Sequence, residues 1–213
     1  MSAKRRTHTH YVAWVGLFLI AALATVATRS CPYFPGDVAV ERWVQSLFSQ
    51  DLSWAERVSH TAEFPRLLVS IALALFLSWL IAGWRAALLS LVSLAGMLGL
   101  GKWLGPSIAR PRPSVDLVHV FRLLKGSSFP SLFALRYAAT FGFLAVLAVR
   151  RSQGTPRAVI VTLSIALLLL GWVARVAMGA HWPSDVIISY YLGILWAAFI
   201  TRLGLRSPRL PPP

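Results

Sequence analysis

Near the C-terminal end of the chain, a histidine and an aspartate stand at a spacing that suits nucleophilic chemistry, in the stretch ARVAMGAHWPSDVIISYYLG. Pro183 favours the first turn of a helix, where its missing N–H costs little. Asp185 then lies in that turn, with His181 just before it. The carboxylate can accept a hydrogen bond from one imidazole nitrogen, which leaves the other nitrogen free to attack phosphorus. The alternative is an interfacial histidine beside Trp182, with Asp185 as a helix cap.

Basic residues at the same membrane level as His181 could form a cradle for a phosphate group. They are Lys102, Arg110, Arg112 and Arg175. Arginine matches phosphate oxygens bidentately and lysine adds a point charge. Ser131 follows Pro130 at a predicted helix start, where its hydroxyl and free backbone N–H groups can bind an anion. Each cation alone could instead be an anchor at the headgroup level, and Ser131 alone could be a simple cap.

Long apolar runs supply the elements that hold these residues at one level. The chain has 213 residues and is 57% hydrophobic and 13% charged, whereas an ordinary soluble domain has about 25% charged residues. Six runs approach the length of about 20 residues that crosses a hydrocarbon core. They are residues 11–28, 66–84, 86–104, 157–178 and 184–203, and 132–149, which is interrupted only by Arg136. Backbone groups in lipid must be satisfied internally, so the predicted fold class is an all-α, polytopic membrane protein, a six-transmembrane-helix bundle.

The first run, 11–28, has a cleaved signal peptide as its alternative interpretation, because the basic stretch AKRR precedes it and small residues end it. Its 18 residues exceed the apolar region of about 7–15 residues that is typical of such peptides. Its removal would also leave an odd number of spans. We therefore keep it as the first membrane helix.

The charge distribution predicts the orientation. With the N-terminus inside and six spans threaded, the inner segments hold ten basic residues and no acidic ones, and all seven acidic residues fall outside. A Lys/Arg excess near the span ends sets topology. The net charge of +14 therefore reflects membrane anchors and the outer motifs, and not a nucleic-acid partner. We expect an integral protein of a bacterial inner (plasma) membrane, with both termini cytoplasmic and the site facing the periplasm.

The expected organisation is a single membrane domain with short ends. Residues 1–10 form a cytoplasmic basic N-terminus and residues 11–203 form the six-helix domain. Residues 204–213 are too rich in proline to pack and are expected to be disordered. Cys31 is the only cysteine, so an internal disulfide and a cysteine-rich metal site are excluded.

Two outer segments connect the spans. Segment 29–65 has apolar residues at roughly helical spacing and is expected to lie on the membrane surface, either as a passive helix or as a lid. Segment 105–131 opens with Gly105 and Pro106, which are expected to end the third span, and continues with the amphipathic stretch SVDLVHVFRLLKGSS.

Taken together, these motifs resemble the type 2 phosphatidic acid phosphatases (the PAP2 superfamily), which share their core with vanadium haloperoxidases. The resemblance covers about residues 95–203. The family has three signatures, K-x6-RP, PSGH and SR-x5-H-x3-D. Arg175, His181 and Asp185 match the third at full spacing, with Ala174 in place of its serine.

The resemblance implies a mechanism without metal or cofactor. The histidine that corresponds to His181 forms a phosphohistidine, and the aspartate that corresponds to Asp185 orients it. The residues implied to hold the phosphate are Lys102, Arg112 (or Arg110), Ser131 and Arg175. Between Lys102 and Arg110 lie seven residues, and between Lys102 and Arg112 lie nine, where the family has six. Because RPRP is a common ending of the first signature, Arg112 is favoured.

The second signature departs most, because PSGH has become Pro130-Ser131-Leu132-Phe133. The family's histidine at this place protonates the leaving oxygen, and a positioned acid contributes about 10²–10⁴-fold in rate. Phe133 cannot do so. His119 and Arg136 are candidate substitutes, and a diphosphate leaving group needs less help because it is a weaker base.

Two hypotheses follow. The first is a membrane lipid phosphatase or phosphotransferase that acts at the outer face on a lipid phosphate or diphosphate, such as phosphatidic acid or undecaprenyl diphosphate. The second is a catalytically impaired relative that binds phospholipid or a partner without turnover. A transporter is disfavoured, because no span carries a central acid or a paired break.

Overall fold

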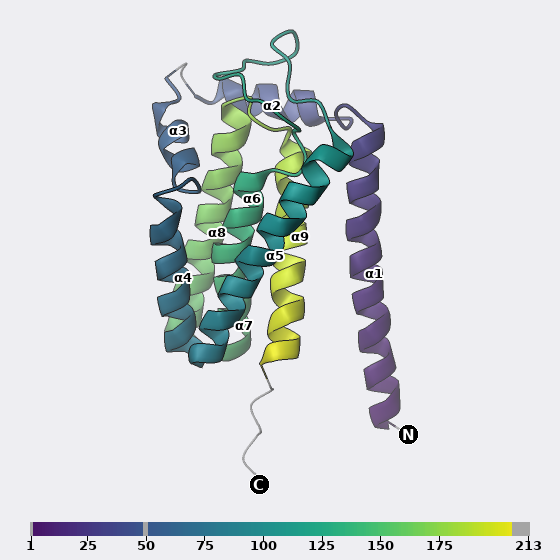
Figure 1. The fold of residues 1–213 in the computed structure, drawn as a ribbon, viewed down its shortest axis with the longest axis vertical. Coiled ribbons are helices and arrows are strands. Elements are labelled where there is room, and N and C mark those ends of the chain that lie inside the picture. Colours follow the sequence, from purple (N-terminus) through teal and green to yellow (C-terminus); the bar gives the residue numbers. More distant parts are fainter. Residues whose placement is uncertain (1, 49–50, 206–213) are drawn as a thin grey trace.

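The computed structural model describes residues 2–48 and 51–205, and within these ranges the chain forms helices, turns and loops without strands. Five helical segments are long and apolar enough to cross a membrane. They are α1 (Ser2–Ser30, apolar from Tyr11), α5 (Trp84–Ile108), the segment Leu132–Arg151, α8 (Gly154–Ala177) and α9 (Pro183–Gly204). A shorter apolar helix, α4 (Leu67–Ala82), lies among them (Figure 1). The predicted all-α membrane bundle and its six spans are confirmed.

The segment Leu132–Arg151 forms the centre of the bundle, because it is the most deeply buried of the membrane-length segments. It consists of α6 (Leu132–Tyr137), a π-helical turn (Ala138–Gly142) and α7 (Phe143–Arg151). Helix α9 packs closely on the π turn, where a side chain on Gly193 would collide with Ala138. No pattern in the amino-acid sequence predicted this π turn.

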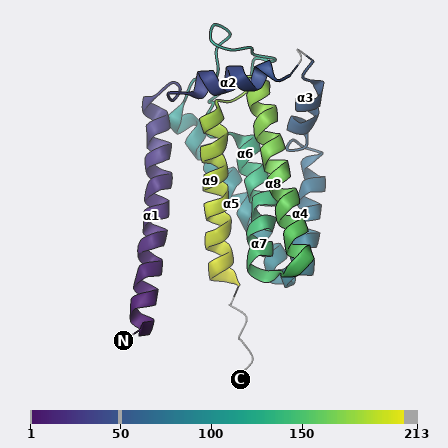
Figure 2. The same ribbon diagram turned by 180° about the vertical axis from the view of Figure 1, so that it is seen from behind.

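Helix α1 stands at the edge of the bundle beside α9 (Figure 2). Aromatic rings join the two helices, since Trp14 and Phe18 lie 5.8 Å and 5.4 Å from the ring of Phe199. The apolar stretch predicted at 11–28 therefore contributes a helix of the bundle, and α1 starts at Ser2, so the basic residues before the stretch continue the same helix.

One end of the bundle carries α2 (Asp37–Ser46), α3 (Ser53–His60) and the loop 109–131, whereas Ser2 and Leu205 lie at the other end (Figure 1). Helix α2 lies across the bundle end and is tied to the loop, because Arg42 Nε donates to the Leu117 carbonyl and Gln45 Nε2 to the His119 carbonyl, both at 2.7 Å. Segment 29–65 therefore contains the predicted helical structure, and α2 is bonded to the loop rather than standing free.

The amphipathic stretch 114–128 of the second outer segment has one turn at 115–117 and is otherwise irregular. Side chains of α2 pair with its backbone at Leu117 and His119. One expectation for this segment is wrong. Gly105 and Pro106 do not end α5, which continues to Ile108. Its last turn closes with a bond from Ala109 N–H to the Gly105 carbonyl at 3.0 Å, and Ala109 then turns the chain with φ 51°.

The division of the chain into a basic N-terminus, a membrane domain and a tail stays a prediction. The expected disorder falls mostly on residues 206–213, which lie outside the described residues.

Candidate active site

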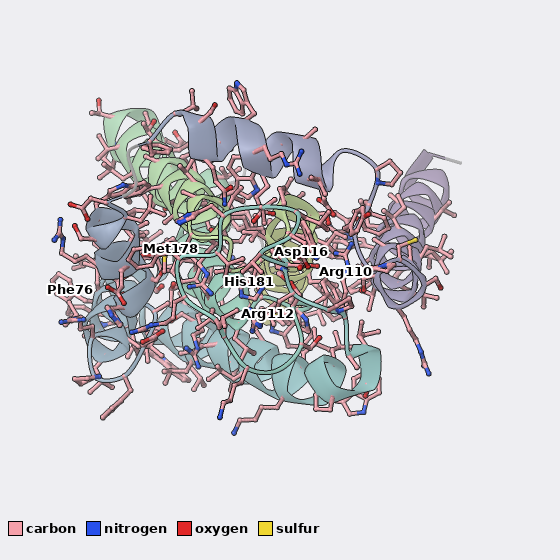
Figure 3. All side chains as sticks on the ribbon, turned by 90° about the horizontal axis from the view of Figure 1, so that it is seen from above. Phe76, Arg110, Arg112, Asp116, Met178 and His181 are labelled. Atoms are coloured by element: carbon pink, nitrogen blue, oxygen red, sulfur yellow. The ribbon has the colours of Figure 1, made fainter. Side chains whose placement is uncertain are left out.

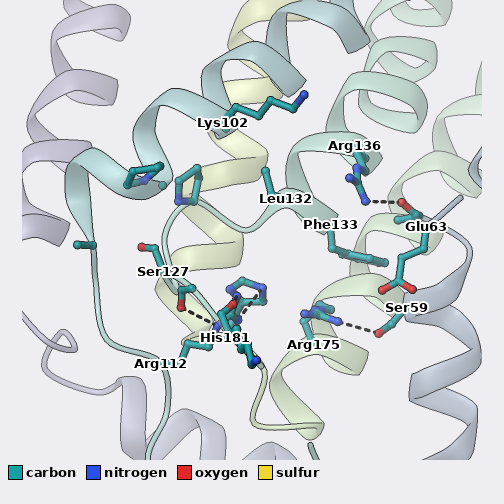
Figure 4. Close-up of a pocket in the computed structure, with 18 residues that line it drawn as sticks. Ser59, Glu63, Lys102, Arg112, Ser127, Leu132, Phe133, Arg136, Arg175 and His181 are labelled. Carbon is teal, nitrogen blue, oxygen red and sulfur yellow. Dashed lines mark hydrogen bonds between the residues drawn. The ribbon is translucent and has the colours of Figure 1, made fainter. Parts of the chain in front are cut away.

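A pocket of about 590 Å³ opens at the end of the bundle that carries α2 and α3. Helices α5, α6 and α8, the loop 109–131 and the turn before α9 all contribute to its wall. Among the lining residues are Lys102, Arg112, Phe133, Arg175 and His181 (Figure 4). The three sequence signatures, which are far apart along the chain, therefore meet at one cavity.

His181 lies in the turn between α8 and α9 and is 3% exposed. Its Nδ1 donates to the Ser128 carbonyl at 2.6 Å, so in the neutral ring the lone pair is on Nε2. Nε2 faces Arg112 Nη1 at a long 3.4 Å. Burial, and then the charges of Arg175 and Arg112, hold the pKa of His181 well below its usual range. The ring is therefore neutral at pH 7, with its free nitrogen directed toward the guanidinium groups.

Asp185 does not accept the direct hydrogen bond from His181 that the sequence led us to expect. Its fully buried carboxylate is ion-paired with Arg110 and accepts the hydroxyl proton of Ser128. Ser128 thus joins the two residues, with its hydroxyl on Asp185 and its carbonyl on His181 Nδ1. Asp185 orients the imidazole through Ser128, because Arg110 takes the place next to the carboxylate.

The structure does not place Arg110 among the residues that line the pocket, so it does not support the prediction that Arg110 binds phosphate. Its side chain is fully buried and lies outside the pocket lining. The guanidinium contacts Asp185, and it also donates to Asp37 Oδ2 at 3.4 Å, the Ser184 hydroxyl at 3.1 Å and the Cys31 carbonyl at 3.0 Å. Seen down the bundle, His181 and Arg112 lie near the centre and Arg110 lies toward α1 (Figure 3). Arg110 is therefore a structural cation that neutralises two buried carboxylates.

Arg112, in contrast, lines the pocket, as the favoured reading of the first signature expected. Its Nη1 donates to the Ala180 carbonyl at 2.6 Å and its Nε to the Gly126 carbonyl at 3.1 Å, which fixes the guanidinium beside His181. Burial lowers its pKa, with the charge of Asp185 acting in the opposite direction.

Arg175 and Lys102 also line the pocket, from α8 and from the outer part of α5. Arg175 Nη1 donates to the Ser59 hydroxyl at 3.1 Å, whereas its buried Nε has no partner. An unsatisfied buried N–H is costly, and a phosphate oxygen in the cavity would relieve that cost. Lys102 is exposed at the pocket edge.

Ser131 is also outside the pocket lining, which leaves it with the simpler role of a helix cap. Its hydroxyl accepts the Ala134 N–H at 3.3 Å, and its own N–H donates to the Ser189 hydroxyl at 3.0 Å. The hydroxyl oxygen of Ser131 therefore caps α6, and the Ser131 N–H is paired with α9. Its neighbours Pro130 and Leu132 reach the cavity.

Phe133 lines the pocket where the second signature has its histidine. Its ring lies 4.2 Å from that of Tyr137, and the Arg175 guanidinium stands 5.5 Å from its centre. Of the two candidate substitutes, Arg136 lines the pocket with an unpartnered buried Nε. His119 is exposed and outside the lining, because its backbone is bonded to Gln45 on α2.

The sequence analysis missed four residues of the site, namely Ser59, Glu63, Lys125 and Ser128. The first three line the pocket and Ser128 carries the bond to His181. Lys125 and Ser128 directly precede the second signature, which was a usable signal. Ser59 and Glu63 come from another part of the chain, where no motif marked them.

No three His, Cys, Asp or Glu side chains within the described ranges come together as metal ligands.

Comparison with known proteins places the chain in a family. The family description PAP2 superfamily matches residues 66–209. A solved structure, that of a transmembrane PAP2-type phosphatidylglycerolphosphate phosphatase from Bacillus subtilis, superposes with a TM-score of 0.72 at 19% identity, over 93% of this chain and 98% of the other. No curated protein sequence matches. Because the family match covers well over half of the chain and includes all three signature regions, this protein belongs to the PAP2 superfamily.

Proposed function

We propose that the chain hydrolyses, or transfers, the phosphate of a lipid phosphate or diphosphate through a phosphohistidine at His181. The observation that supports this most directly is the neutral imidazole of His181, held by Ser128, with its free nitrogen in a pocket among arginines. A protein that only binds phosphate has no use for an oriented nucleophile.

The contacts suggest a sequence of steps. Arg112, Arg175 and Lys102 bind the non-bridging oxygens and neutralise their charge. His181 Nε2 attacks phosphorus, the bond to the leaving oxygen breaks, and the ring becomes positively charged. The Ser128 carbonyl, which accepts from Nδ1, stabilises that charge. Water then attacks the phosphohistidine and frees His181, or an alcohol does so in a transferase.

The proposed location is the periplasmic face of a bacterial inner membrane. The pocket is lined by residues of α3 and of the loop 109–131, and these elements lie at the end of the bundle opposite the start of α1 and the end of α9 (Figure 1). The Lys/Arg excess in the segments assigned to the inner side supports cytoplasmic termini, which leaves the pocket outside, within reach of lipid headgroups.

The pocket favours a substrate that carries more than one phosphate. Its lining includes five basic residues, which is more positive charge than the charge of one phosphate monoester balances. They are Lys102, Arg112, Lys125, Arg136 and Arg175. Phe133 offers no proton to a poor leaving group, and a diphosphate leaves as a weak base. We therefore propose a lipid diphosphate, with an isoprenyl diphosphate as the first compound to test and phosphatidic acid as the monoester for comparison.

The test is phosphate release by the purified protein in lipid vesicles, with each of these two lipids. Turnover that produces an acid-labile, base-stable phosphoprotein supports the proposal. Tight binding of both lipids without any phosphate release supports the alternative, a PAP2-like protein that binds lipid phosphate without turnover, which the loss of the second-signature histidine at Phe133 favours.

Replacing Phe133 by histidine is expected to raise turnover of the monoester by about 10²-fold, because an imidazole at the place of the second signature is a more effective acid than any group now in the pocket. Turnover of the diphosphate should rise less than about tenfold, since its leaving group needs little protonation. The smaller ring fits the space between Tyr137 and Gly171. Initial rates on both lipids measure the two factors, and equal factors would contradict this account of the leaving group.

The pH profile should reflect the neutral state of His181. Attack requires the unprotonated ring, which is fully present above its pKa. Because burial and the neighbouring arginines lower that pKa well below 6.5, kcat/KM should stay level as the pH falls through 6.5 and decline only at lower values. The profile is measured on the diphosphate, with its own ionisation followed by phosphorus NMR. An acid limb centred at or above 6.5 would contradict a neutral, buried nucleophile.

A further inference from the structure

Glu63 is the only acidic residue among the described residues that line the pocket. It follows α3 in a turn in which its N–H donates to the His60 carbonyl at 3.1 Å. Its carboxylate interacts electrostatically with the guanidinium groups of Arg136 and Arg175. Arg175 stands over the ring of Phe133, and the close-up shows Glu63 on the same side of the pocket as Phe133, across from His181 (Figure 4). The carboxyl group is therefore near the place where the second signature lost its histidine.

His60 stands directly behind Glu63. Its Nδ1 lies 2.9 Å from Glu63 Oε2, and its Nε2 lies 3.8 Å from Glu56 Oε1. Glu56 in turn pairs with Arg122 at 3.1 Å. All of these side chains are partly exposed to solvent, so a proton lost from the pair of Glu63 and His60 can be replaced from water.

A carboxylate is an unexpected lining group in a cavity that is proposed to bind phosphate. A negative charge beside a phosphate is repelled at contact distance, by about 1 kcal/mol even in water and by more where water is excluded. A protonated carboxyl group does not repel the phosphate, and its O–H can donate to a substrate oxygen. A carboxyl group at this place in the pocket therefore suits the role of an acid toward the leaving oxygen.

We propose that Glu63, supplied with protons by His60, is the general acid and base of the reaction in place of the missing histidine; this rests on the proposed function. As His181 Nε2 forms its bond to phosphorus, the bond to the leaving oxygen breaks and that oxygen takes the proton of the Glu63 carboxyl group. The resulting carboxylate then accepts one proton from the water that attacks the phosphohistidine. The proton given in the first step returns in the second, so the cycle is balanced.

Leaving-group dependence tests the assignment. Glu63→Gln keeps the shape of the side chain but carries no transferable proton. We expect kcat/KM for an alkyl phosphate monoester, such as phosphatidic acid, to fall about 10²-fold. For p-nitrophenyl phosphate, whose phenolate leaves unprotonated, the fall should be less than about threefold. Equal losses on the two substrates would assign Glu63 a structural role and overturn the proposal.

A second variant distinguishes chemistry from folding. In the Phe133→His background the new imidazole supplies the proton, so adding Glu63→Gln should cost less than about threefold on the monoester. A structural defect would instead cost the same in both backgrounds. Asp116→Asn is the matched control, since it also removes one carboxylate at the same end of the bundle, from an exposed residue bonded only to Ser114. It should retain full activity.

These outcomes separate failure of the inference from failure of the proposed function. If His181→Ala abolishes turnover while Glu63→Gln shows no leaving-group dependence, the phosphohistidine stands and only the acid is misassigned. If His181→Ala leaves turnover unchanged, both fall together.

Discussion

Replacing His181 by alanine is expected to lower kcat by about 10⁶-fold, the order of loss measured in a covalent hydrolase when its nucleophile is removed. The physical reason is that His181 is the one histidine among the described residues that line the pocket, and Ser128 fixes its tautomer. The measurements are phosphate release from the lipid diphosphate and trapping of the phosphorylated protein, both of which should disappear.

Two further variants make this result interpretable. His181→Asn retains an N–H that can donate to the Ser128 carbonyl, so the turn keeps its hydrogen bond while the nucleophile is absent. His119→Ala removes an exposed imidazole from the same end of the molecule and should keep activity within about twofold, as surface changes usually do. Comparable losses in the variants at 181 and 119 would contradict the assignment of the nucleophile.

The second large effect is expected on stability, from Arg110→Ala. Removal of one partner from a buried ion pair costs about 3–5 kcal/mol, because the opposite charge is left buried without compensation. Arg110 lies between two such carboxylates, Asp185 and Asp37, and Asp37 in turn accepts from the Ser184 N–H and hydroxyl at the start of α9. The loss should lower the midpoint of thermal unfolding by roughly 10 °C for a chain of this size.

Arg112→Ala is the matched control for Arg110→Ala. Arg112 contacts backbone carbonyls at the pocket edge, so its removal should change the midpoint by much less and should raise KM for the lipid phosphate instead. If Arg110→Ala keeps the stability of the parent and raises KM, then Arg110 is a phosphate ligand after all, and the ion pairs of the structure are not those of the functional state.

Much of the fold could be predicted from the sequence, because a span in lipid must be apolar and internally hydrogen-bonded. That requirement set the approximate positions of the six spans. A proline signal marked the start of α9 correctly, whereas α6 begins two residues after Pro130, the residue predicted to open it. Helix ends and irregular backbone were harder to predict. The extension of α5 through Pro106 and the π turn at Ala138–Gly142 depend on neighbouring helices, as does the irregular course of 114–128, which is bonded to α2.

For the site, the residue types and spacing of Arg175, His181 and Asp185 were enough to recognise the family and to propose its nucleophile, because they match the third signature at full spacing. The tertiary structure alone decided the partners of each group. Arg112 lines the pocket, whereas Arg110 pairs with buried carboxylates. Ser128 lies between Asp185 and His181. Glu63 lies beside Phe133. The reason is that buried charges must be compensated in space, and neighbours along the chain do not reveal which distant side chain does so.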